Sequence, residues 1–260
     1  MKPNRFKAKR VAGQMPIGHM IMEFGTPNMA KLLESADVDF VIIDMEHSRF
    51  TTDDLASLSA WFKATEIAPF VRIPQLQYHF IARTLDLGML GIMVPDVRTR
   101  AQAAEVVAAA KYAPMGDRGV ALGGSATDFR SVNPRQFMDY ANDNTTIICQ
   151  IESVEGLANI EEIASVPGVD VLWVGHFDLT HSMGIPGQFD DPRFLEALQR
   201  VVSVAHRYGL SAGVQPRSLE QAEEWIAAGF DVISYGSDFS VYANALRTGV
   251  GRIRKLAQGI

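Results

Sequence analysis

Residues 40–73 read FVIIDMEHSRFTTDDLASLSAWFKATEIAPFVRI and contain one complete strand–helix–strand unit. Residues 40–43 and 70–73 are apolar at nearly every position, as is typical of parallel strands covered on both faces. Residues 52–63, between them, are amphipathic and predict a helix. A unit of this kind indicates a parallel sheet with helices packed against it.

The same alternation extends through the rest of the chain. Further strand-like apolar runs occupy residues 17–22, 91–94, 147–151, 171–174, 210–214 and 232–235. Further helical patterns occupy residues 99–110, 134–140, 192–208 and 219–228, the last of them closed by Gly229. Eight strands in 260 residues favour a closed (β/α)8 TIM barrel, built as a single domain over residues 1–260, rather than an open doubly wound sheet.

One connection is longer than the others. Residues 111–131 read KYAPMGDRGVALGGSATDFRS, which is rich in glycine and turn-forming residues. Because loops of this length inside a compact domain are usually functional or disordered, we expect a lid or a subunit-contact loop here.

Charge and hydropathy exclude several partners. The net charge is −6, and the nearest approach to a basic patch is Lys2, Arg5, Lys7, Lys9 and Arg10, which we interpret as a solvated arm or an edge helix. This pattern predicts no nucleic-acid partner. No run approaches the roughly 18 apolar residues that span a bilayer, so we expect no membrane partner and a cytoplasmic enzyme.

The chain has one cysteine. An intrachain disulfide is therefore excluded, and Cys149 lies in the apolar run of residues 147–151. We expect a buried and inert thiol.

Polar side chains follow four of the predicted strands, where barrel enzymes carry their chemistry. Glu152 and Asp178 follow two neighbouring strands and could together hold one divalent cation with open positions for water and substrate. Arg72 would place a fixed positive group on the enolate oxygen of a 2-oxoacid. These groups predict a metal-dependent aldolase.

His47 follows the second strand and suits the removal of a proton. Asp44 or Asp86 could orient it. Taken singly, a carboxylate at a strand end is often a helix N-cap, and Arg72 with Glu46 could be a structural ion pair. An imine-forming aldolase would need a lysine at a strand end, whereas the lysines at positions 31, 63 and 255 fall in helical segments and the one at position 111 at a helix end.

Six motifs in this order resemble one known family, the HpcH/HpaI-type class II pyruvate aldolases, which includes 4-hydroxy-2-oxoheptane-1,7-dioate aldolase and 2-keto-3-deoxy sugar acid aldolases. The motifs are residues 44–47 (DMEH), 72–74 (RIP), 86–95 (DLGMLGIMVP), 112–119 (YAPMGDRG), 150–152 (QIE) and 175–179 (GHFDL). The resemblance covers nearly the whole chain.

The resemblance implies a role for each matching residue. His47 is expected to be the base, Arg72 the enolate stabiliser and Asp86 the carboxylate that raises the basicity of the histidine. The remaining positions are Glu152 and Asp178 as metal ligands, Gln150 and the Phe177 backbone as substrate contacts, and Asp44 and Glu46 in support of them. The resemblance further implies Mg²⁺, Mn²⁺ or Co²⁺ as the cation and a homohexamer formed by helix exchange.

The expected reaction is reversible cleavage of a 4-hydroxy-2-oxoacid into pyruvate, or hydroxypyruvate, and an aldehyde. A citryl- or malyl-type lyase acting on a coenzyme A thioester and a non-catalytic barrel stay open as alternatives. A phosphate-binding isomerase would use residues 235–238 (YGSD), although Ser237 or Asp238 reads more simply as a helix cap.

Two further local features bear on the predicted site. The family loop commonly has proline where this chain has His176, which we interpret as a tolerated replacement. Side chains such as His19, Phe24 and Leu122 are expected to shape the aldehyde pocket.

Overall fold

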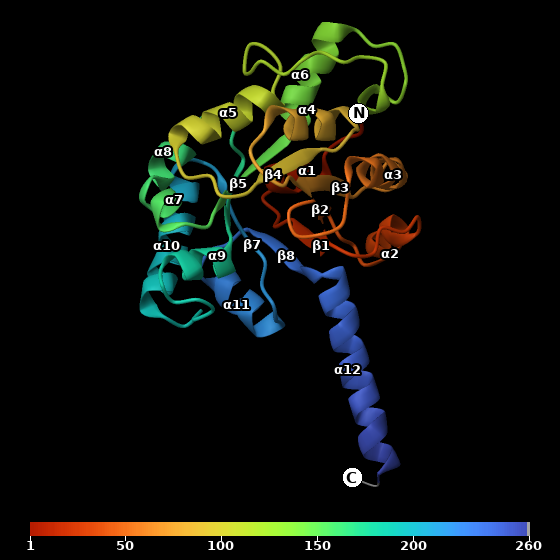
Figure 1. The fold of residues 1–260 in the computed structure, drawn as a ribbon. Helices are drawn as coiled ribbons and strands as arrows, with labels where there is room; N and C mark the ends of the chain where they lie inside the picture. Colours follow the sequence, from red (N-terminus) through yellow and green to blue (C-terminus); the bar gives the residue numbers. More distant parts are fainter. Residues whose placement is uncertain (259–260) are drawn as a thin grey trace.

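Eight parallel strands close into one barrel in the computed structural model, which describes residues 1–258 (Figure 1). Each strand pairs with its neighbours in sequence, and β1 pairs with β8 to complete the ring. The strands are β1 (Ile17–Ile21), β2 (Phe40–Asp44), β3 (Ala68–Arg72), β4 (Gly91–Val94), β5 (Thr146–Ile151), β6 (Val171–Val174), β7 (Ser211–Val214) and β8 (Val232–Ser237). The predicted TIM barrel is confirmed.

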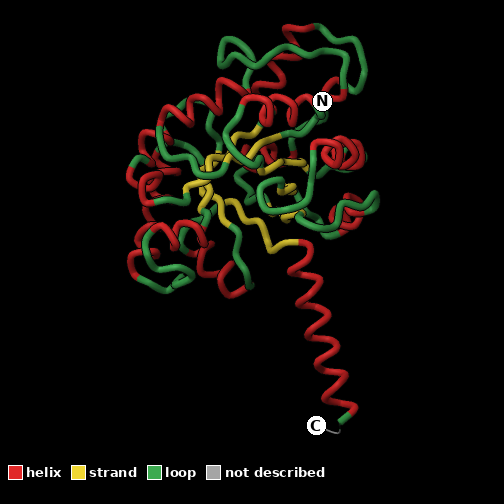
Figure 2. Tube along the Cα trace, in the orientation of Figure 1, coloured by secondary structure: helices red, strands yellow, loops and turns green. Residues whose placement is uncertain are grey.

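Helices α2 to α11 lie around the barrel and return the chain from one strand to the start of the next, whereas α1 precedes β1 and α12 follows β8 (Figure 2). The helices are α1 (Arg5–Val11), α2 (Met29–Ser35), α3 (Thr52–Phe62), α4 (Tyr78–Asp86), α5 (Arg100–Ala110), α6 (Pro134–Asn144), α7 (Val154–Ala158), α8 (Ile160–Ala164), α9 (His176–Ser182), α10 (Pro192–Arg207), α11 (Leu219–Ala227) and α12 (Asp238–Ala257). A short 3-10 helix covers Ser125–Thr127.

Every predicted strand is present, and the largest boundary errors, of two residues, are at the start of β3 and at the end of β8. The sequence pattern placed β3 at residues 70–73, whereas it begins at Ala68 and includes Pro69. Proline cannot donate a ladder hydrogen bond and therefore reads as a strand boundary. Here Pro69 contributes only its carbonyl, which accepts the amide of Leu90 at 2.8 Å.

The amino-terminal segment closes one end of the barrel. Phe6 on α1 is fully buried, and its ring lies 5.3 Å from the rings of both Phe40 and Phe70 inside the barrel. Lys2 donates from Nζ to three backbone carbonyls, and Arg5 pairs with Asp39 at 2.7 Å. The interpretation as a solvated arm was therefore wrong, and that as an edge helix was the better one. The basic side chains hold α1, with its buried Phe6, against the end of the barrel.

The long connection of residues 111–131 lies at this same closed end. Lys111 is buried, and its ammonium donates to the carbonyls of Asn142 and Thr145, immediately before β5 begins. Lys63, at the end of α3, holds the other part of the loop through the carbonyl of Ser125. Because the carboxyl ends of the strands lie at the opposite end, this chain's own loop does not cover them, and the subunit-contact expectation stays a prediction.

Helix α12 leaves the barrel after β8 and extends well beyond it (Figure 1). Tyr242, Leu246, Val250 and Ile253 recur along it every three or four residues and are 43–66% exposed. Such spacing places them on one face of the helix. None of the helices within residues 1–258 has the length and apolar character needed to cross a membrane.

Candidate active site

A cavity of about 870 Å³ opens at the carboxyl ends of the strands. Met20, Met93 and Trp173, which point into the barrel, form its floor. Five of the predicted site residues line it, namely His47, Arg72, Gln150, Phe177 and Asp178. The structure thus brings together groups that are separated by up to 131 residues in sequence.

Asp44 fixes Arg72 on the floor side of this cavity. The two residues face each other as register partners at the ends of β2 and β3. Arg72 donates from Nε and Nη2 to the two carboxylate oxygens of Asp44, at 2.8 and 2.9 Å. Asp44 is fully buried and also accepts the backbone amides of Glu46 and His47. The Asp44 carboxylate therefore fixes the position of the Arg72 guanidinium and of the loop that carries His47.

The charge of Arg72 is secured in the same way. Burial works to lower the pKa of Arg72, but the hydrogen bonds and charge of Asp44, aided by Glu46, raise it above its ordinary value. Its Nη1 atom makes no hydrogen bond to any of residues 1–258. The arginine accordingly presents a permanent cation with one free donor nitrogen.

Glu46 lies between Arg72 and His47. Its Oε2 atom is 3.3 Å from Arg72 Nε and 3.8 Å from His47 Nε2. Burial raises the pKa of Glu46, and the charges of Asp44 and Asp178 act in the same direction. The His47 side chain is 58% exposed. Glu46 thus forms the ion pair with Arg72 that the sequence left open, and it is also a neighbour of His47.

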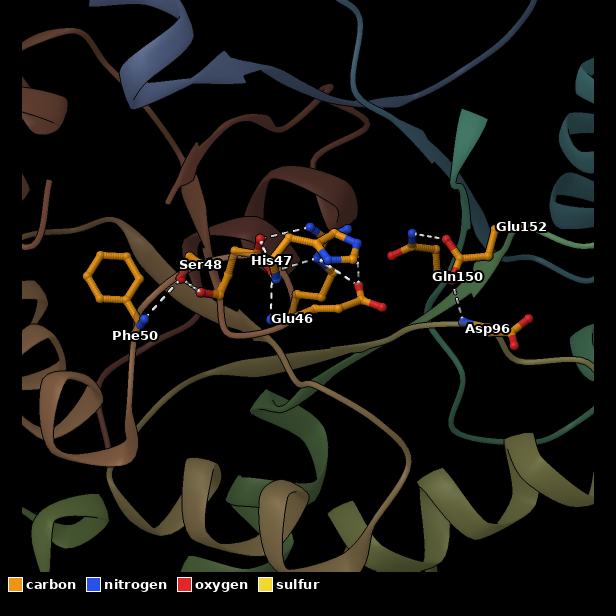
Figure 3. A network of polar contacts seen from close by, with 9 residues as sticks. Glu46, His47, Ser48, Phe50, Asp96, Gln150 and Glu152 are labelled. Carbon is orange, nitrogen blue, oxygen red and sulfur yellow. Dashed lines mark hydrogen bonds and ion pairs between the residues drawn. The ribbon is translucent and has the colours of Figure 1, made fainter. Parts of the chain in front are cut away.

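Gln150 lines the cavity, and Glu152 is hydrogen-bonded to it without itself lining the cavity (Figure 3). Glu152 is buried, accepts the amide of Asp96 at 2.7 Å and accepts a second hydrogen bond from Gln150 Nε2. Burial raises the pKa of Glu152 to about 7, and the nearby charges of Glu46 and Asp178 add to this effect. The Oε1 atom of Gln150 is buried without a hydrogen-bond partner.

These groups fit a hard cation with an incomplete protein shell. Within residues 1–258, no cluster of three or more histidine, cysteine or acidic side chains forms a complete metal site. Glu152 and Asp178 could supply two carboxylates, and the charges of Asp178 and Glu46 both act on Glu152. A magnesium-like ion takes oxygen ligands and keeps water or substrate in its other positions, which suits this arrangement.

Gly175 makes room for these carboxylates. A Cβ atom at this position would lie 2.2 Å from Glu152 Oε2 and 2.7 Å from Gln150 Nε2. Real Cβ atoms do not approach other heavy atoms so closely, so the site requires glycine after β6. The following residue, His176, is buried against Phe177, Phe189 and Trp225.

Burial lowers the pKa of His176 to about 4, and the charge of Arg217 acts in the same direction. The imidazole is therefore neutral near pH 7. Although His176 borders the cavity, its Nε2 atom is buried and has no partner in the described part of the chain. Its interpretation as a replacement that the loop tolerates stays a prediction.

Asp86 is the one predicted catalytic residue that the chain does not bring to His47. It lies at the end of α4, near the amino ends of the strands, where Arg118 Nη2 contacts its carboxylate at 2.5 Å. It borders a separate pocket of about 670 Å³. Its expected partnership with His47 is untested within one chain.

Several features of the cavity were not anticipated. Gln215 and Arg217 after β7, and Met22 after β1, line it, whereas His19, Phe24 and Leu122 do not. Residues beyond a strand end carry no sequence signal that tells an inward from an outward side chain. No lysine from the described residues lines the cavity, in agreement with the argument against an imine.

At the alternative phosphate site, residues 235–238, the carboxylate of Asp238 is already bonded to the chain's own backbone. The carboxylate of Asp238 accepts the backbone amides of Met22, Glu23 and Phe24 at 3.1, 2.9 and 2.7 Å. Asp238 therefore ties the loop after β1 to the start of α12. A buried carboxylate at this point disfavours a bound phosphate.

Comparisons with known proteins agree with this architecture. The family model for HpcH/HpaI aldolase/citrate lyase matches residues 21–245. A 5-keto-4-deoxy-D-glucarate aldolase from Escherichia fergusonii is 34% identical over 251 residues, which are 96% of this chain and 95% of the relative.

Solved structures give the same result. An HpcH/HpaI aldolase from Desulfitobacterium hafniense matches with a TM-score of 0.92 and 30% identity over 96% of each chain. The citrate synthase SbnG matches with a TM-score of 0.87 and 29% identity over 98% of this chain and 99% of its own. Taken with the barrel and its polar rim, these matches mean that the chain belongs to the HpcH/HpaI aldolase/citrate lyase family and is a carbon–carbon lyase.

Proposed function

We propose that the chain cleaves and forms 4-hydroxy-2-oxoacids through the enolate of pyruvate or hydroxypyruvate, with an aldehyde as the second product. One observation carries the proposal. Arg72, whose Nη1 atom makes no hydrogen bond to residues 1–258, lines the same cavity as Asp178 and Gln150, and Gln150 donates a hydrogen bond to Glu152. A cationic donor opposite a carboxylate pair suits a substrate that gains negative charge on a keto oxygen.

Glu152 and Asp178 would hold a divalent cation such as Mg²⁺, Mn²⁺ or Co²⁺, which when bound supplies Lewis-acid stabilisation of that charge. Arg72 donates from Nη1 toward the keto oxygen, and Asp44 keeps the guanidinium plane fixed during the reaction. Gln150 and the backbone amide of Phe177 contact the 2-oxoacid itself. Gln150 and Glu152 are both buried.

His47 is the proposed base. It removes the proton of the substrate's 4-hydroxyl group as the carbon–carbon bond breaks, and the electron pair of that bond passes to the 2-oxoacid carbon skeleton. The aldehyde leaves, and a proton added to the enolate carbon completes pyruvate. The exposed position of His47 at the cavity wall allows its proton to exchange with solvent.

The test is exchange of solvent deuterium into the methyl group of pyruvate, followed by nuclear magnetic resonance. We expect exchange with added Mg²⁺, Mn²⁺ or Co²⁺ and its loss after exhaustive chelation, because enolate formation needs the cation. Exchange that persists after chelation, with no metal retained, would overturn the proposal. Tight binding of coenzyme A would instead support the thioester lyase.

The expected homohexamer is part of this proposal, as is a cytoplasmic location. The apolar face of α12, formed by Tyr242, Leu246, Val250 and Ile253, is exposed in one chain. Burial of such a face against another copy would stabilise the helix, since most helical stability in proteins comes from the packing of an apolar face. Light scattering coupled to gel filtration should report a hexamer for the wild type and a smaller species for Leu246→Glu.

The assembly also affects Asp86. In one chain Asp86 and His47 lie at opposite ends of the barrel, because α4 runs antiparallel to the strands. We therefore propose that the carboxylate that raises the basicity of His47 comes from Asp86 of a neighbouring chain. Its partly exposed position, at 34%, leaves it accessible to such a contact.

A further inference from the structure

The carboxylate of Asp86 is held by a single residue of its own chain. Arg118 Nη2 contacts Asp86 Oδ1 at 2.5 Å, and within residues 1–258 the carboxylate makes no other hydrogen bond or ion pair. The Arg118 side chain is 1% exposed, whereas that of Asp86 is 34% exposed. The ion pair therefore joins a buried cation to a carboxylate that solvent or another chain can reach.

The Arg118 guanidinium is fixed by the packing around it. Its carbon lies 4.7 Å from the centroid of the Tyr112 ring, and that ring lies 6.4 Å from the ring of Phe137. Tyr112 is buried, and its backbone exchanges two hydrogen bonds with the side chain of Asn142, at 2.7 and 2.9 Å. Stacking on a fixed ring restrains the plane of a guanidinium. The donor that meets Asp86 therefore has one direction.

The backbone around Arg118 is bound to two neighbouring helices. The Arg118 amide donates to the carbonyl of Lys111, at the end of α5, at 3.0 Å. The next amide, that of Gly119, donates to the hydroxyl oxygen of Tyr78 at 2.8 Å. Tyr78 is the first residue of α4 and Asp86 is the last. The loop therefore contacts α4 at both of its ends and holds Asp86 from a fixed base.

The contact leaves half of the Asp86 carboxylate free. Arg118 binds Oδ1, and Oδ2 makes no hydrogen bond to any of residues 1–258. A buried guanidinium needs an anion to offset its loss of hydration, and Asp86 is the one carboxylate paired with Arg118 among the described residues. Arg118 and Asp86 therefore stay together, with one carboxylate oxygen left to accept the N–H group of an imidazole.

We propose that Arg118 is a positioning residue for aldol cleavage. It fixes Asp86 so that Oδ2 accepts a hydrogen bond from His47 of a neighbouring chain and supports that histidine as the base. Arg118 does not line the cavity, so it acts through Asp86 alone. The inference rests on the proposed function of His47 and Asp86, and it gives the long connection of residues 111–131 a part in the reaction.

The first experiment measures two reactions of Arg118→Met, namely cleavage of 4-hydroxy-2-oxopentanoate and decarboxylation of oxaloacetate. Only cleavage needs the base. Because a displacement of about 1 Å in a catalytic group can cost about 10²-fold, cleavage should fall by about 10- to 100-fold more than decarboxylation. The loss should be in kcat and not in KM, since Arg118 touches no substrate. Equal losses in the two reactions, with an unchanged circular dichroism spectrum, would overturn the inference.

A milder variant and a matched control accompany this measurement. Arg118→Lys keeps a cation beside Asp86 but not the stacked plane, so it should separate the two reactions in the same direction and to a smaller extent. It decides the question if Arg118→Met does not fold, because equal losses in Arg118→Lys would also overturn the inference. The control is Arg135→Met, which removes a guanidinium from its ion pair with Asp139 on the exposed surface of α6. Both of its rates should equal those of the wild type.

Subunit mixing shows on which side of the shared site Arg118 acts. Arg118→Met mixed with His47→Ala should regain cleavage above either parent, because one chain supplies an intact His47 and the other an intact Arg118–Asp86 pair. Arg118→Met mixed with Asp86→Asn should regain none, because every pair then lacks one member. No gain in the first mixture, or a gain in the second, contradicts the assigned role.

The same mixtures separate this inference from the proposed function. A gain for Asp86→Asn with His47→Ala, together with none for Arg118→Met with His47→Ala, refutes the role of Arg118 alone. No gain in either mixture refutes the shared site as well. Deuterium exchange into pyruvate tests the remaining assumption, because its absence in the wild type refutes the aldolase itself.

Discussion

The carboxylate of Asp44 receives Nε and Nη2 of Arg72 at 2.8 and 2.9 Å, at the one place where β2 and β3 end side by side. A lysine ammonium at the same position could not hold a fixed hydrogen bond to Asp44 and to the substrate at the same time, because it is a point charge on a flexible stem. The guanidinium donates to Asp44 from Nε and Nη2 and keeps Nη1 for the substrate.

Arg72→Lys should therefore lose about 10²- to 10³-fold in pyruvate deuterium exchange although the positive charge is kept, the size expected for one lost oxyanion donor. Circular dichroism should show an unchanged fold. Arg98→Lys is a matched control, since Arg98 pairs with Asp96 outside the cavity. Near wild-type exchange in Arg72→Lys would contradict the assigned role.

Gly175→Ala should abolish most activity without unfolding the barrel. The added methyl group would meet Glu152 Oε2 at 2.2 Å, so the carboxylate must move away from its place beside Asp178. Metal affinity, measured by calorimetry, should fall along with turnover. Gly124→Ala serves as the control because a Cβ atom there has no neighbour within 4 Å, and it should behave as the wild type.

His47→Ala should separate two reactions that share one enolate. Decarboxylation of oxaloacetate needs no proton removed from a hydroxyl group, whereas aldol cleavage does. Cleavage should therefore fall by about 10- to 100-fold more than decarboxylation, within the usual size of general-base catalysis. In Glu152→Ala both should fall together. Equal losses in His47→Ala with unchanged metal content would mean that His47 positions substrate instead.

Mixing subunits tests the proposed role of Asp86. A preparation of His47→Ala and a preparation of Asp86→Asn should each be impaired. Assemblies formed after dissociating and mixing the two contain sites with an intact His47 from one chain and an intact Asp86 from another. Turnover should then exceed that of either parent. Turnover at the average of the parents would assign Asp86 only to its ion pair with Arg118.

The buried thiol of Cys149 gives a stability prediction with a defined sign. Burial raises the pKa of Cys149 to about 12, whereas an ordinary thiol ionises near 9. The thiol therefore contributes stability that is fully present below pH 9 and is lost as pH rises toward 12.

Between pH 8 and 10.5, the advantage of the wild type over Cys149→Ala in urea unfolding should shrink by roughly 2 kcal/mol, at about 1.4 kcal/mol per pH unit. The native protein should also resist thiol reagents until urea unfolds it. A constant difference between the two proteins would contradict the assigned burial.

The sequence predicts the barrel well because parallel strands covered on both faces leave an unmistakable apolar run. The positions of Asp44, Arg72 and Glu152 are predictable for the same reason, since each lies at the end of a strand and the order of the strands in the barrel fixes where that end lies. Arg217 escaped notice because it lies three residues beyond β7, where side-chain direction depends on the loop. The sequence motif also could not show that Asp86 and His47 lie apart within one chain, because helix direction, which the motif does not express, places Asp86 at the opposite end of the barrel; the role of Asp86 stays a prediction.

The amino-terminal plug has a kinetic consequence. With Phe6 sealing one end and Met20, Met93 and Trp173 forming the floor, reactants can enter and leave only by the rim. Arg72 and Gln150, two of the residues assigned to the 2-oxoacid, are buried, whereas Phe177, Asp178 and Arg217 are exposed. We therefore expect an ordered mechanism. In aldol addition pyruvate binds before the aldehyde, and in cleavage pyruvate leaves after the aldehyde. Pyruvate should accordingly inhibit cleavage competitively against the 4-hydroxy-2-oxoacid, while the aldehyde should inhibit it noncompetitively.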